Sequence, residues 1–227
     1  MIEPLMVTCG VRWFPICEYW IDQINFLDKL KIRYFHHGDA LRIARDYFLN
    51  HDYTHLLIYA EDIVTTPDNV KLLIKDAEKY DFPVISGWCN FDFKKNWLAF
   101  NFIDMRKVSV FYAEQYRFPQ VDYVLTRSLD NPFVEVFYQG MALTLIRRDV
   151  VEKVSFKPYK VSYKQLGTRW FSAGSMYDLQ FAIELANMGV KNVVDLRCFA
   201  VHFGNTTKYV KADLIGNGKV EFIPKSV

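Results

Sequence analysis

The sequence lacks the features that mark several classes of protein. No apolar run approaches the ~18 residues that a membrane-spanning helix needs, and the run around His55 to Ala60 has the length of a strand. The first residues, Met1-Ile2-Glu3-Pro4, lack the basic-then-apolar order of a secretory signal. The four cysteines form no CxxC pair, so we expect them in the core of a cytoplasmic protein: Cys9, Cys17, Cys89 and Cys198.

An excess of charge is also missing. The chain has 28 basic and 26 acidic residues, and a formal net charge of +2 gives no strong field toward nucleic acid or an anionic membrane. There is no fixed-period repeat, low-complexity tract or Pro/Gly-rich linker, which favours a single domain over residues 1–227. Aromatic residues, in contrast, reach 17%, which predicts a well-packed globule without disorder.

Strand and helix patterns alternate over residues 1–87. The predicted helices are supported by four-residue apolar spacing and by a capping residue before a proline. Strands separated by such helices predict an α/β fold, in which a mostly parallel central sheet carries helices on both faces. The strands are 5–9, 32–35, 55–60 and 84–86, the last ended by Gly87, and the helical residues are Ile16, Trp20, Ile24 and Leu27, then Leu41, Ala44 and Phe48, then the helix opened by Thr66-Pro67.

Residues 88–227 follow a different pattern. Short aromatic runs, broken by charged and turn residues, predict a small antiparallel portion, and a clear helix is expected before Gly189. We therefore divide the domain into a nucleotide-binding half, 1–87, and a second half, 88–227. The runs of the second half are 97–102, 108–112 and 137–146, with helices over 149–154 and 178–188 and a last strand over 198–202.

Two adjacent carboxylates, Glu61 and Asp62, follow the third predicted strand. In open α/β sheets ligands bind beyond the carboxyl ends of the strands, so the loops after Cys9, Phe35, Ala60 and Ser86 should surround one crevice. Hard oxygen ligands there suit Mg²⁺ or Mn²⁺ bridging a diphosphate. An acidic pair before a helix can also be a solvated loop, and both interpretations stay open.

Six segments, in their order along the chain, resemble the motifs of GT-A glycosyltransferases, especially their family-2-like members. The resemblance implies a GT-A (Rossmann-like) fold and a hexosyltransferase-type enzyme that uses a nucleotide-diphosphate sugar. The acceptor, bound by residues 88–227, would be a carbohydrate, a protein or a lipid-linked molecule. The segments are Ala44-Arg45-Asp46, Leu56 to Asp62 with Pro67 and Leu72, Val84 to Gly87, Gly140 to Arg148, Asp178 to Phe181 with Gly189, and Val201 to Gly204.

The resemblance also implies roles for individual residues. Asp62 would be the first metal ligand and His202 the second, whereas Ala60 stands where the family has another acid. Asp178 would be the general base of an inverting transfer, because a carboxylate there would take the proton of the acceptor hydroxyl. The donor would lie against Thr8, Cys9, Gly10, Gly38, Asp39, Arg45 and Glu61, and Trp88, Trp97 or Trp170 could stack on sugar rings.

Each assignment has a structural alternative. His202 can be an ordinary hydrogen-bonding residue at a strand end, and Arg45 can form a surface ion pair. Asp178 fits a capping box that starts at Ser175. Trp170 is the best sugar-stacking candidate because it lies in a stretch, 167–174, with glycines that could act as hinges.

Two other functions remain open at this point. The loss of an acid at Ala60 suits a degenerate GT-A domain that binds a nucleotide-sugar, or a partner, without turnover. A sugar nucleotidyltransferase shares the parallel sheet and the need for metal, although the segment from Gly10 to Pro15 is a poor version of a basic, glycine-rich phosphate loop.

Overall fold

A computed structural model describes residues 2–10, 14–89, 102–104, 132–166, 169–175, 177–202, 208–213 and 219–224. For some of these it describes the backbone alone, namely Ile16, Cys89, 102–104, 160–166, 169–175, Phe199, Val201, His202, 208–213 and 219–224. No helix in this part of the chain is long and apolar enough to cross a membrane. Residues 97–101 of the predicted run 97–102, with Trp97 among them, and the whole predicted run 108–112 lie outside the described residues.

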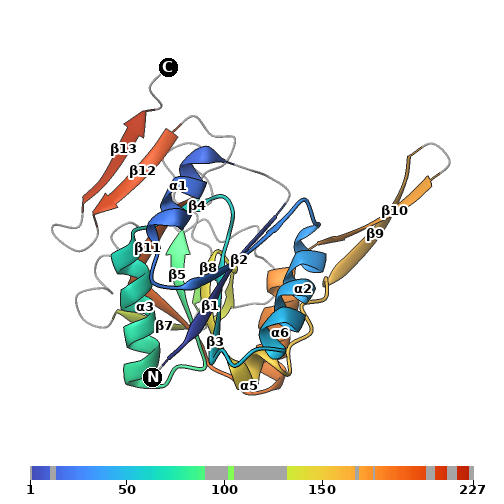
Figure 1. The fold of residues 1–227 in the computed structure, drawn as a ribbon, viewed down its shortest axis with the longest axis horizontal. Helices are drawn as coiled ribbons and strands as arrows, with labels where there is room; N and C mark the ends of the chain where they lie inside the picture. The colour runs from blue at the N-terminus through green and yellow to red at the C-terminus, as the bar shows by residue number, and fades with distance from the viewer. Residues whose placement is uncertain are drawn as a thin grey trace.

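A mixed nine-stranded sheet forms the centre of the molecule (Figure 1). Its order is β2-β1-β3-β8-β5-β11-β7-β6, and β4 pairs with β11 beside this path. Strands β2, β1, β3, β5 and β11 run parallel to one another, and β8 and β7 run against them, which confirms the predicted α/β fold. The bounds are β1 Pro4–Gly10, β2 Asp28–Arg33, β3 His55–Tyr59, β4 Ile63–Val64, β5 Val84–Cys89, β6 Phe102–Asp104, β7 Phe133–Gln139, β8 Leu143–Arg147 and β11 Asn192–His202.

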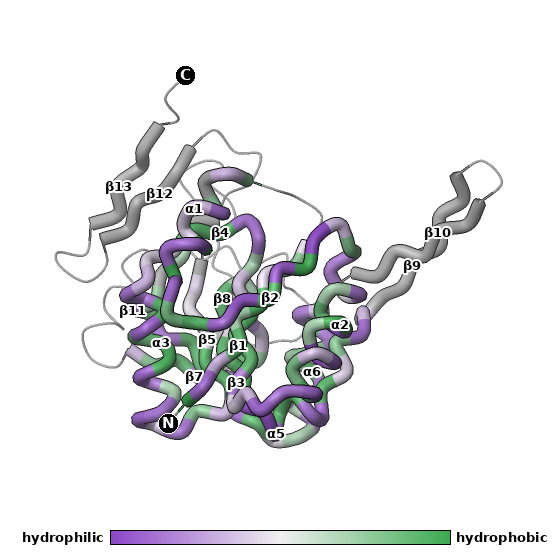
Figure 2. The backbone as a smooth tube through the Cα atoms, in the orientation of Figure 1, coloured by the Kyte–Doolittle hydropathy of each residue, from purple (hydrophilic) through white to green (hydrophobic). Residues whose placement is uncertain are grey.

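Helices cover both faces of the sheet. Successive residues of a strand point to opposite faces, so each central strand contributes side chains to both cores. In β1, Leu5 and Val7 belong to the core under α2, α5 and α6, whereas Met6 belongs to the core under α1 and α3. Figure 2 shows hydrophobic residues along β1, β3 and β8 in the middle of the molecule and hydrophilic ones on the outer side of α3. The helices are α1 Pro15–Gln23, α2 His37–Leu49, α3 Pro67–Tyr80, α5 Arg148–Val151 and α6 Tyr177–Asn187.

Local sequence signals place several helix ends. The hydroxyl of Thr66 accepts a hydrogen bond from the backbone of Asn69 at 3.3 Å, and Pro67 opens α3, as the capping pattern predicts. Gly189 follows α6 with φ of 66°, a left-handed conformation that glycine adopts without a Cβ penalty.

The first helix and the second strand lie elsewhere than predicted. Strand β2 covers 28–33 instead of 32–35, because Ile32 is its buried residue while Tyr34 and Phe35 are exposed and Tyr34 has a left-handed φ of 65°. Helix α1 ends at Gln23 and buries Cys17 and Ile21 fully, whereas the expected Trp20 is only half-buried.

The predicted run 137–146 is two strands, β7 and β8, separated by a turn at Gly140. Strand β8 enters the sheet between β3 and β5 and runs against both. Strand β5 does not end at Gly87 but continues to Cys89, and β11 begins at Asn192, six residues before the predicted 198. Two hairpins, β9–β10 (Lys160–Leu166, Arg169–Ser175) and β12–β13 (Lys208–Asp213, Lys219–Pro224), pair outside the main sheet.

Candidate active site

The carboxylate of Glu61, two residues after the end of β3, lies against Gly10 at the end of β1. Gly10 is the last residue of β1, and a Cβ built there would lie 1.4 Å from the Oε2 atom of Glu61 and 1.8 Å from its Cδ atom. Only a residue without a side chain leaves room for this carboxylate. The side chain of Glu61 is 4% exposed, so the structure holds a buried acid at the carboxyl edge of the parallel strands.

Asp62 follows directly, and its side chain is 6% exposed. Strand β4 begins at the next residue, Ile63, and pairs antiparallel with the end of β11 so that Ile63 and His202 are Cα partners. The last residue of β11 therefore lies opposite the residue after Asp62, and the backbone brings together the two predicted metal ligands, which are 140 positions apart in the sequence.

The chemistry of these residues fits a hard divalent cation. Carboxylate oxygens from Glu61 and Asp62 are the ligands that Mg²⁺ and Mn²⁺ prefer, whereas the assignment of His202 as a further ligand comes from the family resemblance. Among the described side chains, no group of three or more His, Cys, Asp or Glu residues is arranged to hold a metal. A cation bound there would therefore depend on His202 or on oxygens of a bound ligand.

Thr8 and Cys9, which we expected at the donor, point into the two cores on opposite faces of β1. The Thr8 side chain is 3% exposed, and its Oγ1 atom has no hydrogen-bond partner among the described residues. Cys9 packs in the core under α2 and α6. Burial, and then the charge of Glu61, raise the pKa of Cys9 to about 12, so its thiol stays neutral.

The starts of α2 and α6 lie side by side at the same edge. A Cβ on Gly38 would lie 2.0 Å from the ring of Tyr177, and the Tyr177 hydroxyl is 3.2 Å from the Nδ1 atom of His36. Because α2 follows β2 directly, the start of α6 is held at the carboxyl edge of the sheet. Asp178 is the next residue of α6.

Both carboxylate oxygens of Asp178 accept hydrogen bonds. The backbone of Leu179 donates to Oδ1 at 2.9 Å, and the hydroxyl of Tyr138 on β7 donates to Oδ2. These two bonds fix the orientation of the carboxylate. The Asp178 residue remains partly exposed.

Two of the residues predicted to bind the nucleotide-sugar donor, Arg45 and Asp39, have other partners in the structure. The Arg45 guanidinium donates to the carbonyls of Val151 at 3.0 Å and Glu152 at 2.8 Å, so it ties α2 to the end of α5. Asp39 is exposed in the first turn of α2 and bonds the Arg42 guanidinium.

Of the three tryptophans expected to stack on sugar rings, only Trp88 has a described side chain, and it is buried. Trp88 is 2% exposed, and its Nε1 atom donates to the carbonyl of Leu196 at 2.8 Å, so it is a core residue. The backbone of Trp170 lies in β10, part of a hairpin that extends away from the main sheet, and Gly167 lies outside the described residues (Figure 1).

Sequence reasoning missed Tyr138 at this site and, outside it, the buried Asp76 of α3. The sequence places Tyr138 within a single apolar run, 137–146. The turn at Gly140 instead puts Tyr138 on a separate strand, β7, where its hydroxyl bonds Asp178 of α6. Asp76 lies three residues after the buried Leu73 on α3, and an acid on an apolar helical stripe was a visible sign of a buried polar network.

Several solved structures align with this chain. The crystal structure of A197 from STIV aligns over 100% of this chain and 95% of that chain with a TM-score of 0.61 and 14% identity. CMP:2-keto-3-deoxy-manno-octonic acid synthetase complexed with CTP aligns over 86% and 89% (TM-score 0.41, 12% identity), and the inositol-1-phosphate CTP transferase from T. maritima over 85% and 66% (TM-score 0.37, 10% identity). No family model and no curated protein matches the sequence. The chain therefore shares the fold of A197 from STIV.

Proposed function

We propose that this protein is a metal-dependent glycosyltransferase that binds a nucleotide-diphosphate sugar at the carboxyl edge of its sheet. The observation that carries the proposal is the buried pair Glu61 and Asp62 at that edge, with Gly10 beneath one carboxylate and the end of β11 beside the other. This is the position where open α/β sheets bind their ligands.

In this proposal Asp62 and His202 would hold Mn²⁺ or Mg²⁺ together with oxygens of the donor's diphosphate. The cation would offset the negative charge of the departing nucleoside diphosphate. Glu61 would contact the donor through water or through the cation, and its carboxylate fits at this edge because Gly10 has no side chain.

Asp178 acts on the acceptor. Its carboxylate takes the proton of an acceptor hydroxyl while the hydroxyl oxygen bonds to the anomeric carbon of the sugar. The bond from that carbon to the diphosphate breaks at the same time, and its electron pair leaves with the diphosphate. Attack from the side opposite the leaving group inverts the anomeric centre, and Tyr138 holds the carboxylate in the required orientation.

Product analysis tests the proposal against its alternatives. Purified protein is incubated with a panel of nucleotide-diphosphate sugars and Mn²⁺, with and without candidate carbohydrate acceptors. Release of nucleoside diphosphate, with transfer to an acceptor or slowly to water, supports glycosyl transfer.

A parallel reaction contains nucleoside triphosphates, sugar 1-phosphates and Mn²⁺. Pyrophosphate release there, without nucleoside diphosphate release in the first reaction, would replace the proposal with a nucleotidyltransferase. Binding of a nucleotide-sugar with no product in either reaction would replace it with a binding protein.

A further inference from the structure

Strand β11 departs from regular pairing in its middle. On the parallel neighbour β5, Val194 pairs with Ser86 and Phe199 pairs with Trp88. Four residues of β11, 195–198, therefore stand opposite one residue of β5, Gly87. We call residues 195–198 the β11 insertion. Such irregularities re-aim the residues that follow them in the strand.

A hydrogen-bond network holds the β11 insertion in one shape. Asp195 is fully buried, and its Oδ1 atom accepts bonds from both the backbone nitrogen and the Nε atom of Arg197, each at 3.0 Å. Leu196 donates its N–H to the carbonyl of Pro132 at 2.8 Å and accepts a bond from Trp88 at 2.8 Å. Backbone groups that the insertion removes from the sheet ladder thus find other partners.

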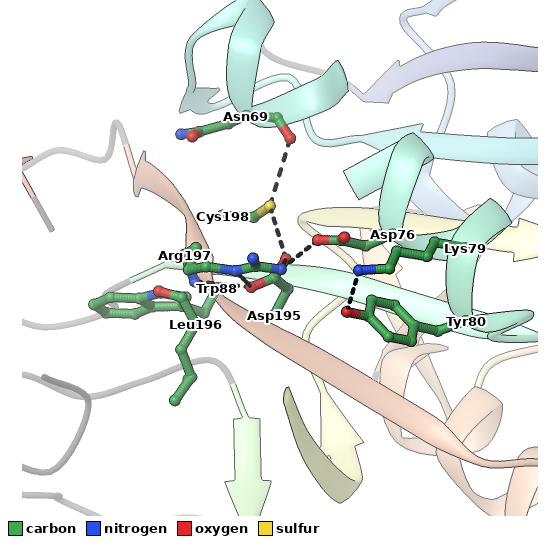
Figure 3. A network of polar contacts seen from close by, with 9 residues as sticks. All are labelled: Asn69, Asp76, Lys79, Tyr80, Trp88, Asp195, Leu196, Arg197 and Cys198. Atoms are coloured by element: carbon green, nitrogen blue, oxygen red, sulfur yellow. Dashed lines mark hydrogen bonds and ion pairs between the residues drawn. The ribbon is translucent and has the colours of Figure 1, made fainter. Parts of the chain in front are cut away.

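Helix α3 contributes the other half of the network. Figure 3 shows the guanidinium of Arg197 between the carboxylates of Asp195 and Asp76, with Asp76 reaching from α3. The Sγ atom of Cys198 lies 3.5 Å from the carbonyl oxygen of Asn69, also on α3. Asp76 is 4% exposed, and removing one member of such a buried charged group would leave the others without compensation.

Gly87 gives the β11 insertion the space it needs. A Cβ on Gly87 would lie 2.6 Å from the backbone oxygen of Cys198 and 2.8 Å from the Cδ2 atom of Leu143. Backbone cannot rotate away as the end of a flexible side chain can. A side chain at position 87 would therefore push the insertion out of place without deleting any of its hydrogen bonds.

The shape of the β11 insertion decides the register of the strand end. Beyond it, Val201 pairs with Val64 and His202 with Ile63. A slip of one residue in a strand turns every following side chain to the other face. A shorter or longer path through 195–198 would take His202 away from its place opposite Ile63 and from Asp62.

We propose that Asp195, Arg197 and Gly87 are positioning residues, which hold the β11 insertion at one length and thereby place His202 next to Asp62. The role of His202 as a metal ligand rests on the proposed function. The register of β11 against β4 does not, so the two can be tested apart.

A cross-strand disulfide measures the register. In Val64→Cys/Val201→Cys, the two cysteines replace Cα partners of the antiparallel pair, which lie ~4.5–5.5 Å apart in such ladders and within disulfide range. The cross-linked fraction is measured by mass spectrometry of the digested protein after mild oxidation. We expect efficient cross-linking with the native network and a several-fold lower fraction when Gly87→Ala or Asp195→Ala is added.

A matched control separates register from general stability. Val150→Ala removes buried side-chain volume from α5, in the core on the other face of the sheet, and should leave the cross-linked fraction unchanged. Circular dichroism checks the fold of each variant, and Asp195→Asn replaces Asp195→Ala if the latter does not fold. Parent-level cross-linking in folded Gly87→Ala and in a folded Asp195 variant would overturn the inference.

The second measurement is the affinity for Mn²⁺, determined by titration of the network variants without the added cysteines. Weaker Mn²⁺ binding in Gly87→Ala and Asp195→Ala, but not in Val150→Ala, supports the positioning role. A parent protein that binds no Mn²⁺ in the presence of nucleoside diphosphate would sink the proposed function alone, because the cross-linking result would still decide the register.

Discussion

The carboxylate of Glu61 occupies the space that a side chain at Gly10 would fill. This relationship joins the end of β3 to the end of β1 and leaves a buried acid at the edge where the sheet would receive its ligand. The first prediction follows from it. Gly10→Ala should destabilise the fold by at most about 1–3 kcal/mol, the range for overpacking, because the buried carboxylate end of Glu61 must rotate away from the new methyl group.

A double-mutant cycle checks the cause. Glu61→Ala removes the group that the new methyl would meet, so Gly10→Ala should cost much less stability in that background, as measured by chemical denaturation. Costs of the two substitutions that add to within ~0.5 kcal/mol would mean that the residues do not compete for this space.

The second prediction concerns Asp178 and Tyr138. Asp178→Asn keeps a side chain that can cap α6 about as well, but it cannot take the acceptor proton, so kcat should fall roughly 10²–10⁴-fold with donor affinity little changed. Tyr138→Phe removes the bond to Oδ2 and should lower kcat by a smaller factor, since the base is still present.

Steady-state kinetics and donor titration measure both variants. Tyr53→Phe is the matched control, because its hydroxyl bonds Asp28 at the start of β2, at the other end of the sheet. A folded Asp178→Asn protein that turns over within a few-fold of the parent would assign Asp178 to capping alone.

The sequence predicted the frame of this site because local signals govern it. The apolar runs that became β1, β3 and β5, and the cap at Thr66, depend on residues close together in the chain. The edge where Glu61 and Asp62 lie then follows from the general plan of parallel sheets.

Long-range pairings were beyond such reasoning. The insertion of β8 between β3 and β5, and the pairing of β4 with the end of β11, join segments about 60 to 140 residues apart. Arg45 shows the limit of motif resemblance, because its guanidinium bonds α5 carbonyls that no motif includes. Gly87 was predicted to end a strand, but it lies inside β5. The backbone of the β11 insertion approaches it so closely that there is no room for a Cβ atom.

The third prediction is a pH dependence of stability that arises at His55, the first residue of β3. Burial, and then the charge of Arg147, lower the pKa of His55 from 6.5 to about 4. Between these values the unfolded chain binds a proton that the folded chain does not. Stability should therefore fall as the pH falls from 6.5 toward 4, by on the order of 3 kcal/mol.

Urea denaturation across this pH range tests it, with His55→Gln as the comparison. The substitution removes the titrating ring, so the difference in unfolding free energy between parent and variant should shrink as the pH falls. A constant difference from pH 7 to pH 4 would show that His55 does not protonate selectively in the unfolded chain.

The central claim is that a cation held by Asp62 and a nucleotide-diphosphate sugar bind together. Titration calorimetry of the parent with nucleotide-diphosphate sugars, in Mn²⁺ and in chelator, measures this directly, and Asp62→Asn is the variant with nearly the same shape. We predict at least tenfold tighter donor binding in Mn²⁺ than in chelator for the parent, about 1.4 kcal/mol, and loss of this dependence in Asp62→Asn. Equal donor affinity of the parent in Mn²⁺ and in chelator would contradict the account.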